Sequence, residues 1–227
     1  MAGPRPEHLL LWAAAAGTLA CGSRTGLTVP ACPDAGVERC NGRDDDCDGV
    51  ADDGLACFFL DGERIAPLSA GLCGADWYSY GRPDAESANP TPDIRASGRV
   101  AVAVVYDADV CAGASVAVIA DLPFDGSGGQ LTAAWTVEPA NAAALLVSDE
   151  PGECTGTPGG GACTWVWQPC CTDGVLVGSF DDACVTVTLG GAMGVTDLVV
   201  LDGVDGRVPR RFDEPFELCA QIRPAAP

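Results

Sequence analysis

Cysteine use constrains this chain more than any other feature, because its 227 residues include thirteen cysteines and not a single lysine. Such usage is typical of proteins that fold in an oxidising compartment, where disulfide bonds form and persist. Setting Cys21 aside leaves an even number of cysteines, which predicts six disulfide bonds. The sequence therefore indicates an extracytoplasmic protein and argues against a cytosolic enzyme.

The N-terminus has the pattern of a secretory signal. Arg5 precedes an apolar run over residues 9–20 that is too short to span a bilayer, and Cys21 follows directly. Small residues before a cysteine resemble a bacterial lipobox, in which the cysteine is acylated. We therefore expect a lipoprotein-type signal over residues 1–20, a lipid on Cys21 and a tether over residues 21–31. Ordinary signal cleavage and an uncleaved anchor are the alternatives.

The formal net charge of −20 narrows the choice of partners. Nucleic-acid binding depends on basic patches that displace counterions, and the twelve arginines of this chain are scattered. We therefore expect no nucleic-acid partner and expect cations instead. Together with the signal, this composition predicts a secreted protein or an outer-membrane lipoprotein of a bacterial cell envelope, held to the membrane by a lipid anchor.

A small acidic module is expected over residues 32–57. It contains four cysteines and few apolar residues, so disulfide bonds and a metal ion would have to replace a hydrophobic core. Three pairings of the four are possible. We favour Cys40 with Cys47, which leaves Cys32 for Cys57.

Within this module, residues 38–54 carry seven carboxylates, a density of like charge that resists folding unless a cation is bound. Counted from Asp44, alternate residues provide oxygen atoms and the sixth residue is glycine, as in an EF-hand loop. Leu55 stands where the closing glutamate of an EF-hand would be, so the shorter calcium loops of extracellular proteins are the nearer match. The predicted ligands are the carboxylates of Asp44, Asp46, Asp48 and Asp52 and the backbone carbonyl of Val50.

Hard oxygen ligands favour Ca²⁺ over zinc or copper, and Mg²⁺ would demand a tighter octahedral geometry. The four cysteines lack the paired spacing of a zinc knuckle. The alternatives are another divalent ion, or an acidic loop that binds no metal and only keeps the protein surface soluble. Because carboxylates that crowd together raise one another's pKa, we expect the module to be loosely ordered without its ion and ordered with it.

The acidic stretch resembles the metal-binding motif of the MopE-like family of bacterial envelope proteins, whose pattern is roughly E-x-C-(D/N)-G-x-D-(D/N)-D-C-D-G-x-x-D-(E/D)-G. The positions that match are Glu38, Cys40, Asn41, Gly42, Asp44, Asp45, Asp46, Cys47, Asp48, Gly49, Asp52, Asp53 and Gly54. The resemblance covers less than a tenth of the chain and implies a secreted or surface-attached metal-binding protein. The family also carries a copper-binding label, but copper prefers imidazole or soft sulfur, and the one histidine, His8, lies in the expected signal. Members often hold several tandem copies of the motif, whereas this chain has one.

The rest of the chain, residues 66–222, predicts a disulfide-braced antiparallel β-sandwich. The eight cysteines from Cys73 onward form an even set, which places the domain boundary near residues 60–66 rather than in the proline-rich stretch 81–93. Alternating or continuous apolar runs bounded by turn residues indicate about nine strands and no helix. These strands are expected at residues 100–106, 115–122, 131–137, 143–148, 163–168, 174–180, 184–190, 197–203 and 215–222.

Two features concern bridges in this domain. Cys154 and Cys163 flank a glycine-rich tip, so a bridge that closes this hairpin is expected. Cys170 and Cys171 are adjacent, and neighbouring residues of a strand point to opposite faces. We therefore expect them to have two different partners, with a bridge between them as the alternative.

Catalysis is not expected. A mature chain without histidine or lysine lacks the usual catalytic base, nucleophile and phosphate-binding groups. The one enzyme class that remains is a glycosidase that uses two carboxylates. Its pair would be Asp181 and Asp182 or Asp202 and Asp205. Acidic pairs in turns are more often solvated. Two noncatalytic functions remain. In the first, the sandwich binds a glycan or an envelope protein. In the second, the protein is an envelope scaffold or a buffer for metal ions, including copper, and has no specific ligand. Trp165 and Trp167 would share one strand face, which suits the core better than a sugar-stacking platform.

Overall fold

The computed structural model describes residues 38, 40, 44–45, 51–52, 54–69, 71–78, 94–122, 125–148, 150–203 and 205–223. All of them belong to one compact unit, Asp34–Pro227. The expected signal, the tether with Cys21 and the proline-rich stretch 81–93 lie outside the described residues.

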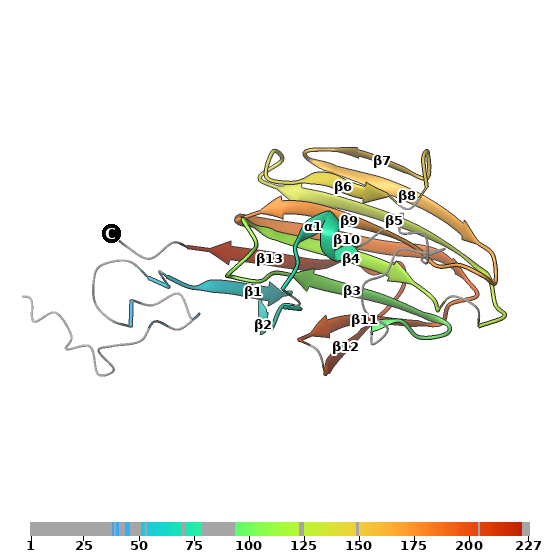
Figure 1. Ribbon diagram of the computed structural model, residues 1–227, viewed down its shortest axis with the longest axis horizontal. Helices are drawn as coiled ribbons and strands as arrows, with labels where there is room; N and C mark the ends of the chain where they lie inside the picture. Colours follow the sequence, from blue (N-terminus) through green and yellow to red (C-terminus); the bar gives the residue numbers. More distant parts are fainter. Residues whose placement is uncertain are drawn as a thin grey trace, which may run out of the picture. The chain divides into compact units, whose positions relative to one another are not determined.

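Two β-sheets build this unit (Figure 1). Sheet A has the order β2-β1-β13-β10-β5-β8-β7 and sheet B the order β12-β11-β3-β4-β9-β6. The strands of sheet A are β1 (Ala56–Leu60), β2 (Glu63–Ile65), β5 (Gly129–Glu138), β7 (Cys154–Thr157), β8 (Gly160–Trp167), β10 (Asp182–Met193) and β13 (Phe216–Ile222). Those of sheet B are β3 (Arg99–Val105), β4 (Ala114–Ala120), β6 (Ala144–Ser148), β9 (Asp173–Phe180), β11 (Asp197–Asp202) and β12 (Gly206–Arg210).

Sheet A shows the alternation that its sequence predicts. In β5, Leu131 and Trp135 are buried while Thr132 and Thr136 lie on the outer face. The inner residues of β5, β8, β10 and β13 pack against sheet B in one hydrophobic core. A strand that buries one face and exposes the other has apolar and polar residues in turn, so the expected half-buried strands are confirmed.

Sheet B is buried on both faces over β3, β4 and β9, which explains their nearly continuous apolar sequences. One short helix, α1 (Gly74–Tyr78), lies on the outer face of this sheet (Figure 1). Trp77 and Tyr78 of α1 are fully buried in a second core with Leu68 and Ile94. This helix was not expected, because five residues are too few to show a helical period.

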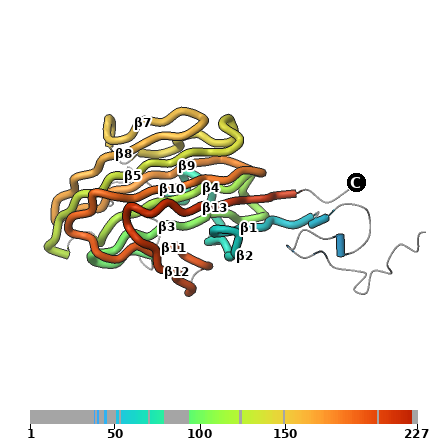
Figure 2. Tube along the Cα trace, turned by 180° about the vertical axis from the view of Figure 1, so that it is seen from behind, coloured from blue at the N-terminus to red at the C-terminus, as the bar shows by residue number. Residues whose placement is uncertain are grey.

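The predicted sandwich is confirmed, with three differences. All nine expected strands form, together with four short ones, β1, β2, β7 and β12. The pairing is antiparallel except between β11 and β3, which run parallel. Sheet A starts at Ala56, before the expected domain start at residue 66, because β1 pairs with β13 (Figure 2).

Five disulfide bonds join described residues, and they correct two of the expected pairings. Cys40 bonds to Cys57 rather than to Cys47, and Cys170 bonds to its neighbour Cys171 rather than to a distant partner. The expected hairpin bridge between Cys154 and Cys163 is confirmed, and the eight cysteines from Cys73 to Cys219 pair among themselves, as their even number predicted. The remaining two bonds are Cys73–Cys111 and Cys184–Cys219.

Polar contacts connect the two sheets along one side of the sandwich. The carboxylate of Asp61, in the β1–β2 turn, accepts a hydrogen bond from the Arg210 guanidinium of β12 at 2.8 Å and another from the backbone N–H of Glu217 at 2.8 Å. The backbone N–H of Ala66 donates to Asp202 at 2.6 Å. These contacts fix the segment that follows the acidic motif against both sheets.

Candidate metal centre

The structure describes part of the acidic motif. Of the five predicted ligands, Asp44 and Asp52 are described, whereas Asp46, Asp48 and Val50 lie outside the described residues. Asp44 is half-buried and Asp52 is only 5% exposed. The geometry of the centre therefore rests on the two ends of the predicted loop.

Glu38 holds these two ends together. One oxygen of its carboxylate accepts the backbone N–H of Asp45 at 2.7 Å, and the other accepts the backbone N–H of Asp52 at 2.7 Å. Hydrogen bonds to an ionised carboxylate are among the stronger ones in proteins. Because Asp45 directly follows Asp44, this clamp brings the first and ninth positions of the loop to the same side chain.

Asp52 has the backbone and burial expected of an inward-turned ligand. Its φ is 55°, a left-handed conformation that aspartate adopts more readily than most residues. A buried carboxylate is stabilised by hydrogen-bond donors or by opposite charge, and a cation bound by the loop is one source of that charge.

The motif is attached to the end of sheet A by three contacts. The Cys40–Cys57 bond ties it to β1, and the backbone N–H of Arg223, just after β13, donates to Leu55 at 2.9 Å. The Arg223 guanidinium also donates to the backbone carbonyl of Ala51 at 2.8 Å. The end of the loop is therefore held by Arg223, which lies 172 residues after Ala51 in the chain.

Sequence reasoning missed the roles of Glu38 and Arg223. Glu38 belongs to the matching motif pattern, and its fixed distance from the aspartates was the signal that could have assigned it. Arg223 had no such signal, since only the pairing of β1 with β13 brings it to the loop.

The donor set that the motif offers fits a hard divalent cation. It consists of carboxylate and carbonyl oxygens, and Cys40 of the motif is bonded to Cys57 of β1 in a disulfide, so its sulfur is not available as a thiolate ligand. Calcium accepts six to eight oxygen ligands in flexible geometry, which suits a loop of closely spaced aspartates. Both oxygens of Glu38 accept backbone N–H groups of the loop, which suits a residue that orients the loop.

A second group of metal-ligand atoms lies on the outer face of sheet A. Ligand atoms of Cys184, Glu217 and Cys219 come within 4.8 Å of one another. Cys184 and Cys219 are bonded to each other, however, and a disulfide sulfur is not the thiolate that binds metals. This group braces β10 against β13 and is a poor metal site.

The other residues singled out by the sequence do not gather into a site. Trp165 and Trp167 are 0% and 4% exposed, so they belong to the core. Asp202 accepts the N–H of Ala66, while Asp181 and Asp182 are exposed where β10 begins. The tryptophans therefore cannot serve as a surface platform for a sugar.

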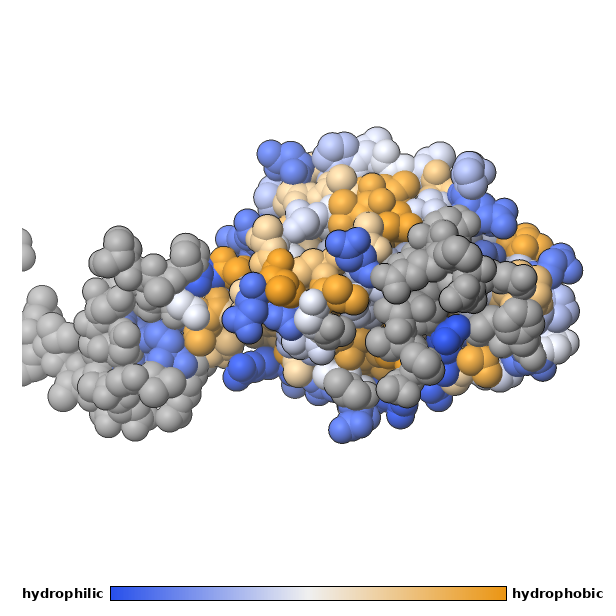
Figure 3. Space-filling view, in the orientation of Figure 1, coloured by the Kyte–Doolittle hydropathy of each residue, from blue (hydrophilic) through white to orange (hydrophobic). Residues whose placement is uncertain are grey.

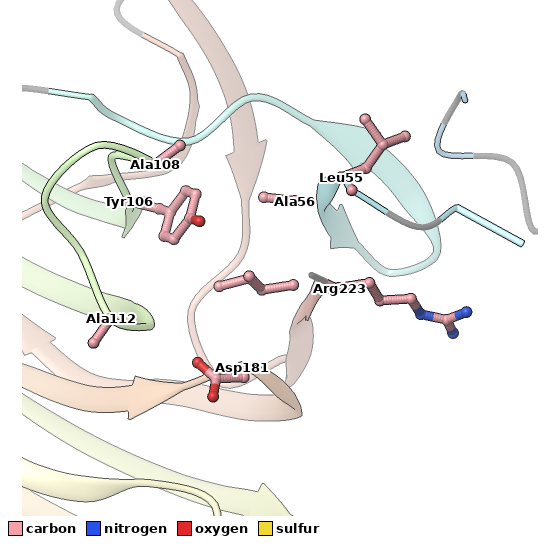
Figure 4. Close-up of a pocket in the computed structure, with 9 residues that line it drawn as sticks. Leu55, Ala56, Tyr106, Ala108, Ala112, Asp181 and Arg223 are labelled. Carbon is pink, nitrogen blue, oxygen red and sulfur yellow. The ribbon is translucent and has the colours of Figure 1, made fainter. Parts of the chain in front are cut away.

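A pocket of about 390 Å³ lies where the motif joins the sandwich (Figure 4). Leu55 and Ala56 line it on the side of the motif, and Tyr106 and Asp181 line it on the side of the sandwich. The Arg223 stem also lines it, while its guanidinium extends away from Tyr106 and Asp181 (Figure 4).

Comparison of the chain with family models, with curated proteins and with solved structures gave no match. Within the described part of the chain, no helix has the length and apolar character needed to cross a bilayer. The disulfide bonds among the described residues indicate an oxidising, extracytoplasmic setting.

Proposed function

We propose that this chain is a bacterial cell-envelope protein, lipidated at Cys21 or secreted, that binds a calcium ion through the loop from Asp44 to Asp52. The ligands are the carboxylates of Asp44, Asp46, Asp48 and Asp52 and the carbonyl of Val50. The ion orders the loop against the end of the sandwich, and the sandwich serves a noncatalytic interaction with a glycan or an envelope protein.

The observation that carries this proposal is the bridge made by Glu38 between the two limbs of the loop, together with the burial of Asp52. Without a cation, closing the loop would bring several carboxylates together at neutral pH, where they repel one another. The contacts of Arg223 and Cys57 add a reason for an ordered loop, because they give it a fixed support.

Isothermal titration of the purified chain with Ca²⁺ tests the proposal. We expect one ion per chain with a dissociation constant of roughly 10⁻⁴ to 10⁻³ M, the range of extracellular calcium modules, and weaker binding of Mg²⁺. Asp52→Asn should abolish most of the heat, while Asp182→Asn, an exposed carboxylate of sheet A, should bind as the wild type does. Equal binding by both variants, or no heat with the wild type, would contradict the proposal.

A second candidate function is an envelope scaffold or metal buffer without a specific ligand, and the burial of Trp165 and Trp167 favours it over sugar binding at those residues. Hydrophobic patches among hydrophilic residues on the face shown in Figure 3 offer contact surface for a partner protein. Stoichiometry separates the two functions. A buffer should take up several ions per chain, copper among them, whereas a structural loop should take up one calcium ion.

A further inference from the structure

One aromatic ring, that of Tyr106, and one carboxylate, that of Asp181, line the pocket beside the motif. Tyr106 is half-buried, its ring lies 5.3 Å from that of Phe58, and its backbone N–H donates to Leu68 at 3.0 Å. The backbone carbonyl of Asp181 accepts the N–H of Ile222 at 2.7 Å. These contacts hold the backbone of both walls, and preorganised walls lower the entropic cost of binding.

Negative charge lies on the side of the pocket that Tyr106 lines, away from the Arg223 guanidinium. Burial, followed by the negative charges of Asp181 and Asp107, raises the pKa of Tyr106. The Asp107 carboxylate accepts a hydrogen bond from the Ser69 hydroxyl at 2.6 Å. The Asp181 carboxylate is exposed, and no described residue forms a hydrogen bond or ion pair with it.

The walls between these groups are small and apolar, with Ala56, Ala108, Ala112 and the side chains of Leu55 and Ile222. Such walls suit the methylene groups next to a charged end. An aromatic face attracts a cation through its ring quadrupole, and a nearby carboxylate adds an ion pair.

We propose that this pocket binds an alkylammonium group, with the ammonium between Tyr106 and Asp181 and its methylene chain against Leu55 and Ile222. Two sources share this chemistry, a free polyamine and a lysine side chain of another protein. The chain itself contains no lysine, so a second copy of it cannot provide the group.

Titration of the ¹⁵N-labelled, calcium-saturated chain with n-butylammonium, followed by NMR, tests the proposal, and n-butanol provides a neutral ligand of matched length. We expect saturable shifts of the amides of Ala56, Ala108 and Ala112 with n-butylammonium, and binding of n-butanol weaker by roughly fivefold or more. Asp181→Asn should weaken n-butylammonium binding by a similar factor, whereas its neighbour Asp182→Asn should not. Tyr106→Leu should also weaken binding, and Tyr106→Phe should retain most of it, because the ring carries the attraction.

Equal affinity for n-butanol and n-butylammonium, unchanged binding by Asp181→Asn, or no saturable shift at these amides would overturn the proposal. Spermidine and Nα-acetyl-lysine amide, which keeps its side-chain ammonium, are titrated in the same way to separate the two sources. The compound that binds more tightly identifies the natural ligand class. The result is independent of the calcium proposal, because the variants lie outside the loop and calcium stays saturating.

Discussion

The carboxylate of Glu38 accepts the backbone N–H of Asp52 at 2.7 Å, fourteen residues further along the chain. Its other oxygen accepts the N–H of Asp45 at the same distance. A single side chain therefore joins the two limbs of the acidic loop, and in the proposed calcium site it would position the ligands without being one of them.

Glu38→Gln tests this arrangement. A glutamine has one oxygen and one NH₂ group, so one of the two backbone donors loses its acceptor and meets another donor, at a cost of about 1.5–3 kcal/mol. We expect calcium affinity to fall roughly tenfold or more, as measured by isothermal titration. Glu63→Gln, at an exposed position of β2, is the matched control, and a Glu38→Gln chain that binds calcium like this control would show that the clamp is unimportant.

Arg223→Met tests the anchor between the loop and the sandwich. Methionine keeps an apolar stem but removes the guanidinium that donates to Ala51, a loss of about 1 kcal/mol. Calcium affinity should fall severalfold while the melting temperature of the sandwich changes little. The comparison is Arg211→Met, whose side chain is 82% exposed. If both variants bind calcium equally well, the loop does not depend on its contact with Arg223.

Because of Asp173, at the start of β9, we expect the free energy of unfolding to depend on pH. This residue is 6% exposed, and burial, followed by the negative charges of Glu153 and Glu150, raises the pKa of its carboxyl to about 7. Between roughly pH 4 and pH 7 the folded chain therefore holds a proton that the unfolded chain has released. The free energy of unfolding should fall as the pH rises through this window, by about 1.4 kcal/mol per unit of pKa difference, and stay low above it.

Asp173→Asn removes the titrating group and should flatten this dependence. Urea denaturation of both proteins from about pH 4 to pH 8 measures it, and the difference between them cancels the contribution of the acidic motif. The variant should gain stability relative to the wild type as the pH rises. Parallel curves for the two proteins would show that Asp173 does not titrate in this range.

Asp121 is also a buried carboxylate, but unlike Asp173 it accepts several hydrogen bonds. We therefore expect its replacement to destabilise the fold. It is 1% exposed and accepts hydrogen bonds from Trp167 at 2.9 Å, from the backbone N–H of Gly98 at 2.8 Å and from Ser127 at 3.2 Å. In Asp121→Asn the amide nitrogen would face one of these donors, at a cost of about 2 kcal/mol by urea denaturation. Asp182→Asn should be nearly neutral, and equal stability of the two variants would contradict this account.

The sequence predicted the long strands because each is long enough to show its period. The alternation in β5 and β10 and the apolar runs of β3, β4 and β9 are properties of the residues themselves. The short edge strands β2, β7 and β12 have three to five residues each and contain Gly, Pro or charged residues, so only pairing with a neighbour makes them strands.

The predicted site shows the same difference between local sequence patterns and contacts between residues that are distant in the sequence. Spacing alone singled out the aspartates of the loop, since their pattern is local. The Cys40–Cys57 bond and the Arg223 contact depend on β1 lying beside β13, and no local pattern contains that information. The vicinal bond between Cys170 and Cys171 was only the alternative expectation, because these residues lie in the turn before β9, where strand alternation does not apply.

Anomalous X-ray diffraction from crystals of the full chain grown with Tb³⁺ in place of Ca²⁺ shows whether the aspartates of the loop surround one ion. We expect one strong peak, about 2.3–2.6 Å from carboxylate oxygens of Asp44 and Asp52. A peak elsewhere, or none at the loop while these carboxylates point away from each other, would contradict it.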